Sequence, residues 1–330
     1  MKKLLLSAAC ALLLPLSMSF AEPISVVTSF SILEDLTENI GQDKINVTSI
    51  IGADQDAHSF EPTPKDIITI QNADVVVLNG VEFDAWLSRL LKANKYEGIV
   101  IDTSRNVPLI ALNDEHSHEE DSHNHDHDHQ HSTDETHIDH KEEDSHDHTH
   151  AHGEYDPHIW QNPMNVIIMT DNIKNGLTLA LPEDAPYFDN NFKSYQEEMI
   201  ALNNYATHIF KTVDTNGKLM VLHNSFAYLA KAYDLNFVAV SNINPLAEPS
   251  AKKMSELYTL VKDENIKAIF SENIAPSRFI TTLASDLKLE DGGILYSDAL
   301  TKTPPANDYI GLFKHNVDQI TKALENSAKE

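Results

Sequence analysis

The feature that most constrains the fold of this 330-residue chain is a repeated alternation of short apolar segments with longer amphipathic ones. The apolar segments are continuous rather than alternating, as in 74–78 (DVVVL), 218–222 (KLMVL) and 266–270 (IKAIF). Continuous apolar runs are typical of strands buried on both faces of a parallel sheet. Parallel strands need a crossover, and the intervening amphipathic segments can supply it as helices. The sequence therefore predicts an α/β fold.

The alternation occurs twice, which together with the length of the chain predicts two lobes, each with a mainly parallel sheet flanked by helices. Between them, residues 182–213 form a long, mostly polar pattern with few helix breakers, and we expect one long rigid helix that joins the lobes. The expected organisation is a signal peptide at 1–21, an N-terminal lobe at 22–181, the connecting helix at 182–213 and a C-terminal lobe at 214–330.

The N-terminus has the pattern of a secretory signal peptide. Lys2 and Lys3 precede an apolar stretch at 4–18, and small residues precede an expected cleavage site after Ala21. We therefore expect an exported, periplasmic protein. Cys10 is the single cysteine and lies within this signal, so a metal site in the mature chain must use nitrogen and oxygen ligands.

Residues 113–153 are dominated by His, Asp, Glu and Ser, with almost no apolar side chain. Such a segment cannot bury enough surface to offset the entropy of ordering, and we expect a disordered loop inserted in the first lobe. Its imidazoles and carboxylates indicate secondary zinc sites that are weaker than an ordered site. The histidines of this loop are His116, His118, His123, His125, His127, His129, His131, His137, His140, His146, His148, His150 and His152.

Four polar residues outside the loop lie at or after predicted strands or directly after the loop: His58, His158, His223 and Asp298. Ligands of open parallel sheets bind beyond the carboxyl ends of the strands, which is the reason to group them. Three neutral imidazoles and one carboxylate are a common set for four-coordinate Zn²⁺. Four protein ligands leave no open position for a substrate water, which favours binding over hydrolysis.

The identity of the fourth ligand has alternatives. Glu61 lies three residues after His58, but Pro62 indicates a turn with an exposed carboxylate, so Asp298 ranks above Glu61. A water molecule is the other alternative. Trp160 is interpreted as a core aromatic beside the site rather than as a metal ligand.

The net charge of −27 argues against nucleic acid or an anionic membrane surface as a partner, and it is compatible with attraction of cations.

Six stretches resemble the metal-binding solute-binding proteins of ABC importers, with the zinc-uptake branch the most similar: GADQDAHSFEPTPKDI, DPHIWQNPMN, LHNSFAYLAKAYDLNF, AEPSAKKM, IFSENI and LYSDAL. The resemblance implies metal binding by His58, His158, a third residue after the first strand of the second lobe, and an acid that Asp298 matches. The third residue is typically His in zinc members and Glu in manganese members, and here it is His223. The resemblance also implies a monomer that works with a permease and its cytoplasmic ATPase.

Three other interpretations stay open at this point. The first is a binding protein of the same family for manganese or another divalent metal. The second is a zinc buffer without a permease partner. The third is a metal-dependent hydrolase, which needs an open coordination position and a general base, and for which Glu61 is the one suggestive base.

Overall fold

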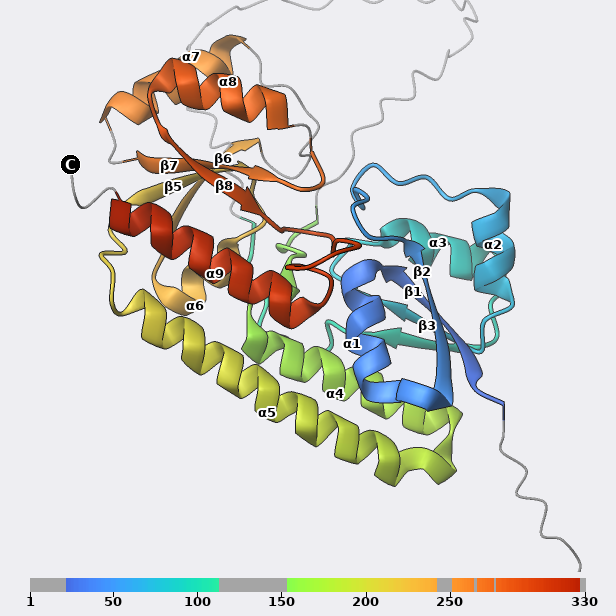
Figure 1. Cartoon of the computed structure of the whole chain (residues 1–330). Helices are drawn as coiled ribbons and strands as arrows, with labels where there is room; N and C mark the ends of the chain where they lie inside the picture. The colour runs from blue at the N-terminus through green and yellow to red at the C-terminus, as the bar shows by residue number, and fades with distance from the viewer. Residues whose placement is uncertain (1–21, 113–152, 242–250, 264–265, 276, 327–330) are drawn as a thin grey trace, which may run out of the picture.

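The structure is a computed structural model that describes residues 22–112, 153–241, 251–263, 266–275 and 277–326. Two lobes lie side by side above a pair of long helices (Figure 1). The expected signal peptide and the thirteen loop histidines lie outside the described residues. Among the helices that are described, none is long and apolar enough to cross a membrane.

The N-terminal lobe contains a four-stranded parallel sheet in the order β2-β1-β3-β4. Its strands are β1 (Ile24–Phe30), β2 (Ile45–Ile51), β3 (Val75–Leu78) and β4 (Ile99–Asp102), and its helices are α1 (Ser31–Gly41), α2 (Pro64–Gln71) and α3 (Ala85–Ala93). All four residues of β3 are buried, as their continuous apolar pattern predicts for a central parallel strand.

The C-terminal lobe repeats this topology, with four parallel strands in the order β6-β5-β7-β8. Its strands are β5 (Lys218–His223), β6 (Asn236–Ser241), β7 (Ile266–Glu272) and β8 (Glu290–Leu295), and its helices are α6 (Ala227–Tyr233), α7 (Ala251–Asp263), α8 (Ser277–Leu287) and α9 (Tyr309–Asn326). The predicted fold class, with two parallel sheets flanked by helices, is confirmed.

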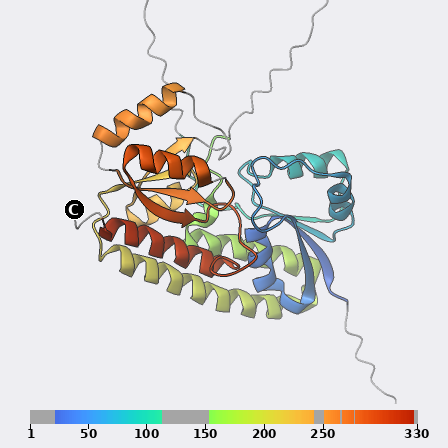
Figure 2. The same ribbon diagram turned by 45° about the horizontal axis from the view of Figure 1, so that its top comes forward.

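Helix α4 (Pro163–Ala180) and helix α5 (Ala185–Phe210) pack against each other beneath both lobes (Figure 2). Along α5, a buried stripe repeats every three or four residues from Phe188 to Phe210. This stripe allows α5 to pack on α1 of the first lobe and on α6 and α9 of the second.

The connecting helix is shorter than the predicted range of 182–213. A separate 3-10 turn, η3 (Pro182–Asp184), precedes α5, and α5 ends at Phe210. Pro186 lacks an N–H and is tolerated within the first turn of a helix, so the regular helix begins just before it.

The two lobes share one buried core. A single cluster of buried apolar residues includes Phe30 and Trp160 from the first part of the chain and Tyr309 and Phe313 from α9. Across the same junction, the carboxylate of Asp35 accepts a hydrogen bond from the backbone N–H of Tyr309 at 3.1 Å. A shared core favours small relative motions of the lobes over a wide hinge.

We predict that the buried Asp35 makes stability decline as pH rises. Burial raises the pKa of Asp35 to about 7, whereas an unfolded carboxyl titrates near pH ~4. The folded state therefore holds a proton that the unfolded chain has lost, and stability falls between these two values. Asp35→Asn keeps an acceptor for the Tyr309 N–H but has no charge to bury.

The gain in stability from Asp35→Asn should be larger at pH 8 than at pH 5, by roughly 2 kcal/mol. Urea unfolding of both proteins with a chelator present, at the two pH values, measures this difference. An equal effect of the substitution at both pH values contradicts the prediction.

Candidate metal centre

His58 projects from the loop that follows β2. The carboxylate of Asp56 accepts a hydrogen bond from the His58 N–H at 2.9 Å and another from the Ser59 hydroxyl at 2.6 Å. Phe60, two residues after His58, packs on Trp86 of α3 with ring centroids 5.1 Å apart. These contacts tie the loop to the N-terminal lobe and leave the largely buried His58 side chain at the centre.

His158 lies just before a 3-10 turn, η2 (Ile159–Gln161), and is fully buried. The Asp156 carboxylate accepts from the backbone N–H of His158 at 2.9 Å and lies 2.7 Å from its Nδ1. The backbone around it is also fixed, because Tyr228 donates to the Asp156 carbonyl at 2.9 Å and Asn79 to the Pro157 carbonyl at 3.0 Å. His158 is therefore held with its Nε2 free to face the centre.

His223 and Glu272 end two neighbouring parallel strands, β5 and β7, and both are buried. One oxygen of Glu272 accepts from the backbone N–H of His223 at 3.1 Å, and the other lies 2.7 Å from its Nδ1. A carboxylate at Nδ1 favours the tautomer that leaves Nε2 free to bind a metal.

Asp298 follows β8 in a segment of the C-terminal lobe that reaches the first lobe. Trp160 and Gln161 both donate to the Ser297 carbonyl at 2.8 Å. The backbone N–H of Leu300 donates to the Ser31 hydroxyl at 3.0 Å, and the Leu300 carbonyl accepts from the N–H of Asp54 at 2.8 Å. These bonds hold the fully buried Asp298 between the lobes.

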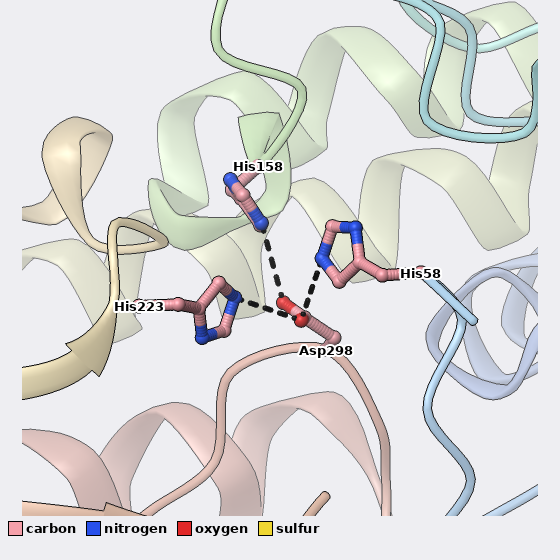
Figure 3. A group of neighbouring side chains, drawn as sticks. All are labelled: His58, His158, His223 and Asp298. Atoms are coloured by element: carbon pink, nitrogen blue, oxygen red, sulfur yellow. Dashed lines mark hydrogen bonds and ion pairs between the residues drawn. The ribbon is translucent and has the colours of Figure 1, made fainter. Parts of the chain in front are cut away.

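The four predicted residues converge on one point (Figure 3). Each offers one donor atom, and these atoms all lie within 4.8 Å of one another. The oxygens of Asp298 lie 3.1 Å from Nε2 of His58, 3.1 Å from Nε2 of His223 and 3.6 Å from Nε2 of His158. In a tetrahedral site with Zn–N bonds near 2.0 Å, ligand atoms are roughly 3.3 Å apart. The three distances to Asp298 are close to this value, and the donor atoms that lie farthest apart have to draw together around a tetrahedral ion.

The three imidazole rings surround this point evenly. Their centroids are 5.5 Å apart for His58 and His158 and 5.4 Å apart for the two pairs that include His223. Glu61, the alternative carboxylate, is exposed and is not part of this group. Among the described residues, the ranking of Asp298 above Glu61 therefore agrees with the geometry.

Several buried atoms at the centre lack a hydrogen bond of good geometry within the described residues. They include Nε2 of His158, Nε2 of His223 and Oδ1 of Asp298. Buried polar atoms are nearly always paired, and an unpaired group calls for an explanation such as a missing ion. A metal bound by these atoms satisfies all three at once.

The electrostatics indicate that a metal displaces a proton here. Burial opposes charge on His223, but Glu272 and Asp298 outweigh it and raise the His223 pKa well above its ordinary value. Burial likewise opposes ionisation of Asp298, but His223 and His158 outweigh it and hold the Asp298 pKa well below its ordinary value. Without metal, the buried pair is an imidazolium and a carboxylate, so metal binding releases the imidazolium proton.

Two carboxylates that orient the histidines were not identified as functional from the sequence. Asp156 and Glu272 contact Nδ1 of His158 and His223, respectively. For Asp156 a signal exists, because a carboxylate two residues before a ligating histidine can orient it. For Glu272 the signal is weaker, because its proximity to His223 depends on the pairing of β5 with β7. Trp160 is a buried aromatic against the His158 ring, as predicted.

The fold and the centre together are those of a two-lobed binding protein, which has a buried group of nitrogen and oxygen donors between its lobes. The model of the family described as zinc-uptake complex component A, periplasmic (ZnuA) matches residues 26–323. The chain therefore belongs to the ZnuA family. This is a family of solute-binding proteins of transporters, and such proteins of ABC importers work with a permease and an ATPase.

Two curated relatives and one solved structure illustrate the family. The chain is 29% identical to the high-affinity zinc uptake system protein ZnuA of Bacillus subtilis over 93% of this chain and 89% of that protein. It is 26% identical to the manganese ABC transporter substrate-binding lipoprotein PsaA of Streptococcus pneumoniae over 93% and 91%. The periplasmic zinc-binding protein TroA of Treponema pallidum has the same fold, with a TM-score of 0.74, 22% identity and coverage of 92% and 99%. Lipoprotein and periplasmic relatives place the chain on the outer side of the cytoplasmic membrane.

We predict that Glu272→Gln weakens binding of a divalent metal by about 10- to 100-fold, the range typical for partners that orient a ligating histidine. The amide keeps the size of the side chain but removes the charge that holds the His223 Nδ1–H. Glu290→Gln is the matched control, because Glu290 is an exposed residue of β8 whose carboxylate accepts from Asn326. Competition with a chromophoric chelator measures both affinities, and equal affinities of the two variants contradict the assigned role.

Proposed function

We propose that this protein captures one Zn²⁺ in the periplasm with His58, His158, His223 and Asp298 and delivers the ion to an ABC permease and its ATPase. The observation that carries the proposal is the convergence of three imidazole nitrogens and one carboxylate, all within 4.8 Å of one another. Imidazole-rich, four-coordinate sites suit Zn²⁺, whereas Mn²⁺ prefers more oxygen ligands in octahedral geometry.

Capture rather than catalysis follows from the same donor set. Four protein ligands complete a tetrahedral shell, and a hydrolytic zinc site needs an open position for water. Closing the shell also requires donors from both lobes, since Asp298 lies in the C-terminal part and His58 in the N-terminal part. An ion between the lobes therefore favours the closed arrangement, and a permease that separates them releases the ion.

A manganese-binding protein of the same family is the second candidate, because the similar PsaA is named as manganese-binding. His223 is the residue that argues against it, since an imidazole at this position replaces the oxygen donor that Mn²⁺ favours.

Metal analysis and competition test the choice of metal. The purified protein lacking residues 113–153 should hold one Zn²⁺ per chain and keep it when equimolar Mn²⁺ is added. His223→Ala should weaken zinc binding at least 100-fold without loss of the folded far-UV spectrum. His208→Ala is the control, because His208 is exposed on α5, away from the centre. Retention of Mn²⁺ in preference to Zn²⁺ refutes the proposal.

We further propose that the histidines of residues 113–153 collect zinc at weaker sites and pass it to the buried centre. Their density supports this, because thirteen of the eighteen histidines lie in this segment, among carboxylates that attract cations. Ordering a segment of this polar composition around an ion costs entropy, so each of these sites should be weaker than the buried centre.

Deletion of 113–153 should abolish the weak zinc sites, leave the tight site intact and slow the loading of that site at low zinc. Isothermal titration of the full and deleted proteins gives the number and strength of sites, and stopped-flow loading gives the rate. Loss of the tight site in the deleted protein contradicts this division of roles.

A further inference from the structure

Asp84 is a buried carboxylate whose role the fold alone does not explain. It stands at the N-cap of α3, where Asp ordinarily caps its own helix, yet its side chain makes no cap hydrogen bond. The carboxylate turns back instead to the end of β3, where it accepts from the N–H of Asn79 at 2.6 Å and of Gly80 at 3.1 Å. Burial raises its pKa to about 6, so a charge at this position is held at a cost in free energy.

The segment that Asp84 holds is a strained turn of residues 79–83. Three successive residues have positive φ, with 84° at Gly80, 50° at Val81 and 60° at Glu82. This region is unfavourable for a residue with a branched β-carbon such as Val81. Strained backbone persists where the surroundings fix it, and it is concentrated at functional sites. The hydrogen bonds from the N–H groups of Asn79 and Gly80 to Asp84 are among the contacts that hold this turn in its conformation.

One end of the turn supports His158. The Asn79 side chain is fully buried, and its Nδ2 donates to the carbonyl of Pro157 at 3.0 Å. Pro157 directly precedes His158, so this bond sets the position of the histidine backbone. The Asn79 carbonyl is fixed as well, since it accepts from the hydroxyl of Thr103 at 3.2 Å.

The other end of the turn supports His58. The ring of Phe83 meets the His58 ring edge-on, with centroids 5.2 Å apart and planes at 82°. Behind it, Phe83 packs on Phe30 and Trp160 at 4.9 Å each, so its own position is fixed. His58 is the least buried of the four donors, and its ring packs against the ring of Phe83.

We propose that Asp84 is a positioning residue of the metal centre: by clamping the turn 79–83 it orients His158 through Asn79 and His58 through Phe83. This inference rests on the proposed function and extends it to a residue that does not touch the ion. Rings held in place before the ion arrives lose less entropy on binding, so tight binding depends on this clamp.

Asp84→Asn tests the clamp, because an amide of the same size keeps one acceptor oxygen but places an NH₂ donor against the other of the two backbone N–H groups, that of Asn79 or that of Gly80. Asp74→Asn is the matched control, since Asp74 also accepts a backbone N–H, from Ser25 at 2.8 Å, but lies at the opposite end of the same sheet. The first readout is the zinc affinity of the protein lacking 113–153. The second is the set of imidazole NMR signals of the metal-free protein, with the exposed His208 of α5 as an internal reference.

Asp84→Asn should weaken zinc binding at least tenfold and broaden or shift the signals of His58 and His158, while the signal of His208 and the Asp74→Asn protein stay unchanged. A zinc affinity within twofold of wild type overturns the inference. So does an equal disturbance of His58, His158 and the distant His208, which indicates general loss of structure.

Two milder variants decide the matter if Asp84→Asn does not fold. Asn79→Ala should disturb His158 more than His58. Phe83→Leu should disturb His58 more than His158, because the Phe83 ring lies 5.2 Å from the His58 ring and 6.1 Å from the His158 ring. If neither histidine responds in this pattern, the positioning role is wrong. Failure of the wild type to bind zinc instead refutes the proposed function, and the NMR readout on metal-free protein still decides the role of Asp84.

Discussion

The contact between the Asp298 carboxylate and three imidazoles is the interaction on which the rest of the structure depends. His58 and Asp298 are 240 residues apart in the chain, yet their side chains meet at 3.1 Å in a buried space. This requires two sheets whose strand ends face each other, a core shared by both lobes, and a segment after β8 that crosses to the first lobe. Helix α5, which packs on helices of both lobes, holds these parts in one arrangement. The four side chains can therefore meet only because the two lobes are held in a fixed relative arrangement.

Charge explains why this arrangement suits capture of a cation. Asp298 lies directly among the three imidazoles. Two further carboxylates lie on the far side of the rings: that of Asp156 is 2.7 Å from Nδ1 of His158, and that of Glu272 is 2.7 Å from Nδ1 of His223. In metal-free protein the excess negative charge is balanced in part by a proton on His223, whose pKa is raised by Glu272 and Asp298 against the effect of burial. With these residues as the proposed ligands, a divalent ion would replace that proton and satisfy the buried donor atoms. Binding is then coupled to proton release, and it weakens in acid.

Much of the fold and of the centre could be predicted from the sequence because both follow from local patterns. Continuous apolar runs identified the parallel strands, and polar residues after them identified His58, His223 and Asp298. The bounds of strand β8 (Glu290–Leu295) are hard to recognise in the sequence, because the strand contains Gly292 and Gly293 and its pairing with β7 is irregular. The contribution of Glu272 depends on which strands are neighbours, and that of Asp84 on a turn with positive φ. Local patterns do not encode these tertiary relations.

The most direct test of the central claim is to locate the ion by anomalous diffraction at the zinc edge. Crystals of the protein lacking 113–153, grown with one equivalent of Zn²⁺, should show one strong peak between the lobes. The account predicts that this peak lies about 2.0–2.2 Å from Nε2 of His58, His158 and His223 and from a carboxylate oxygen of Asp298. A peak elsewhere, or one bonded to fewer than three of these imidazoles, contradicts it.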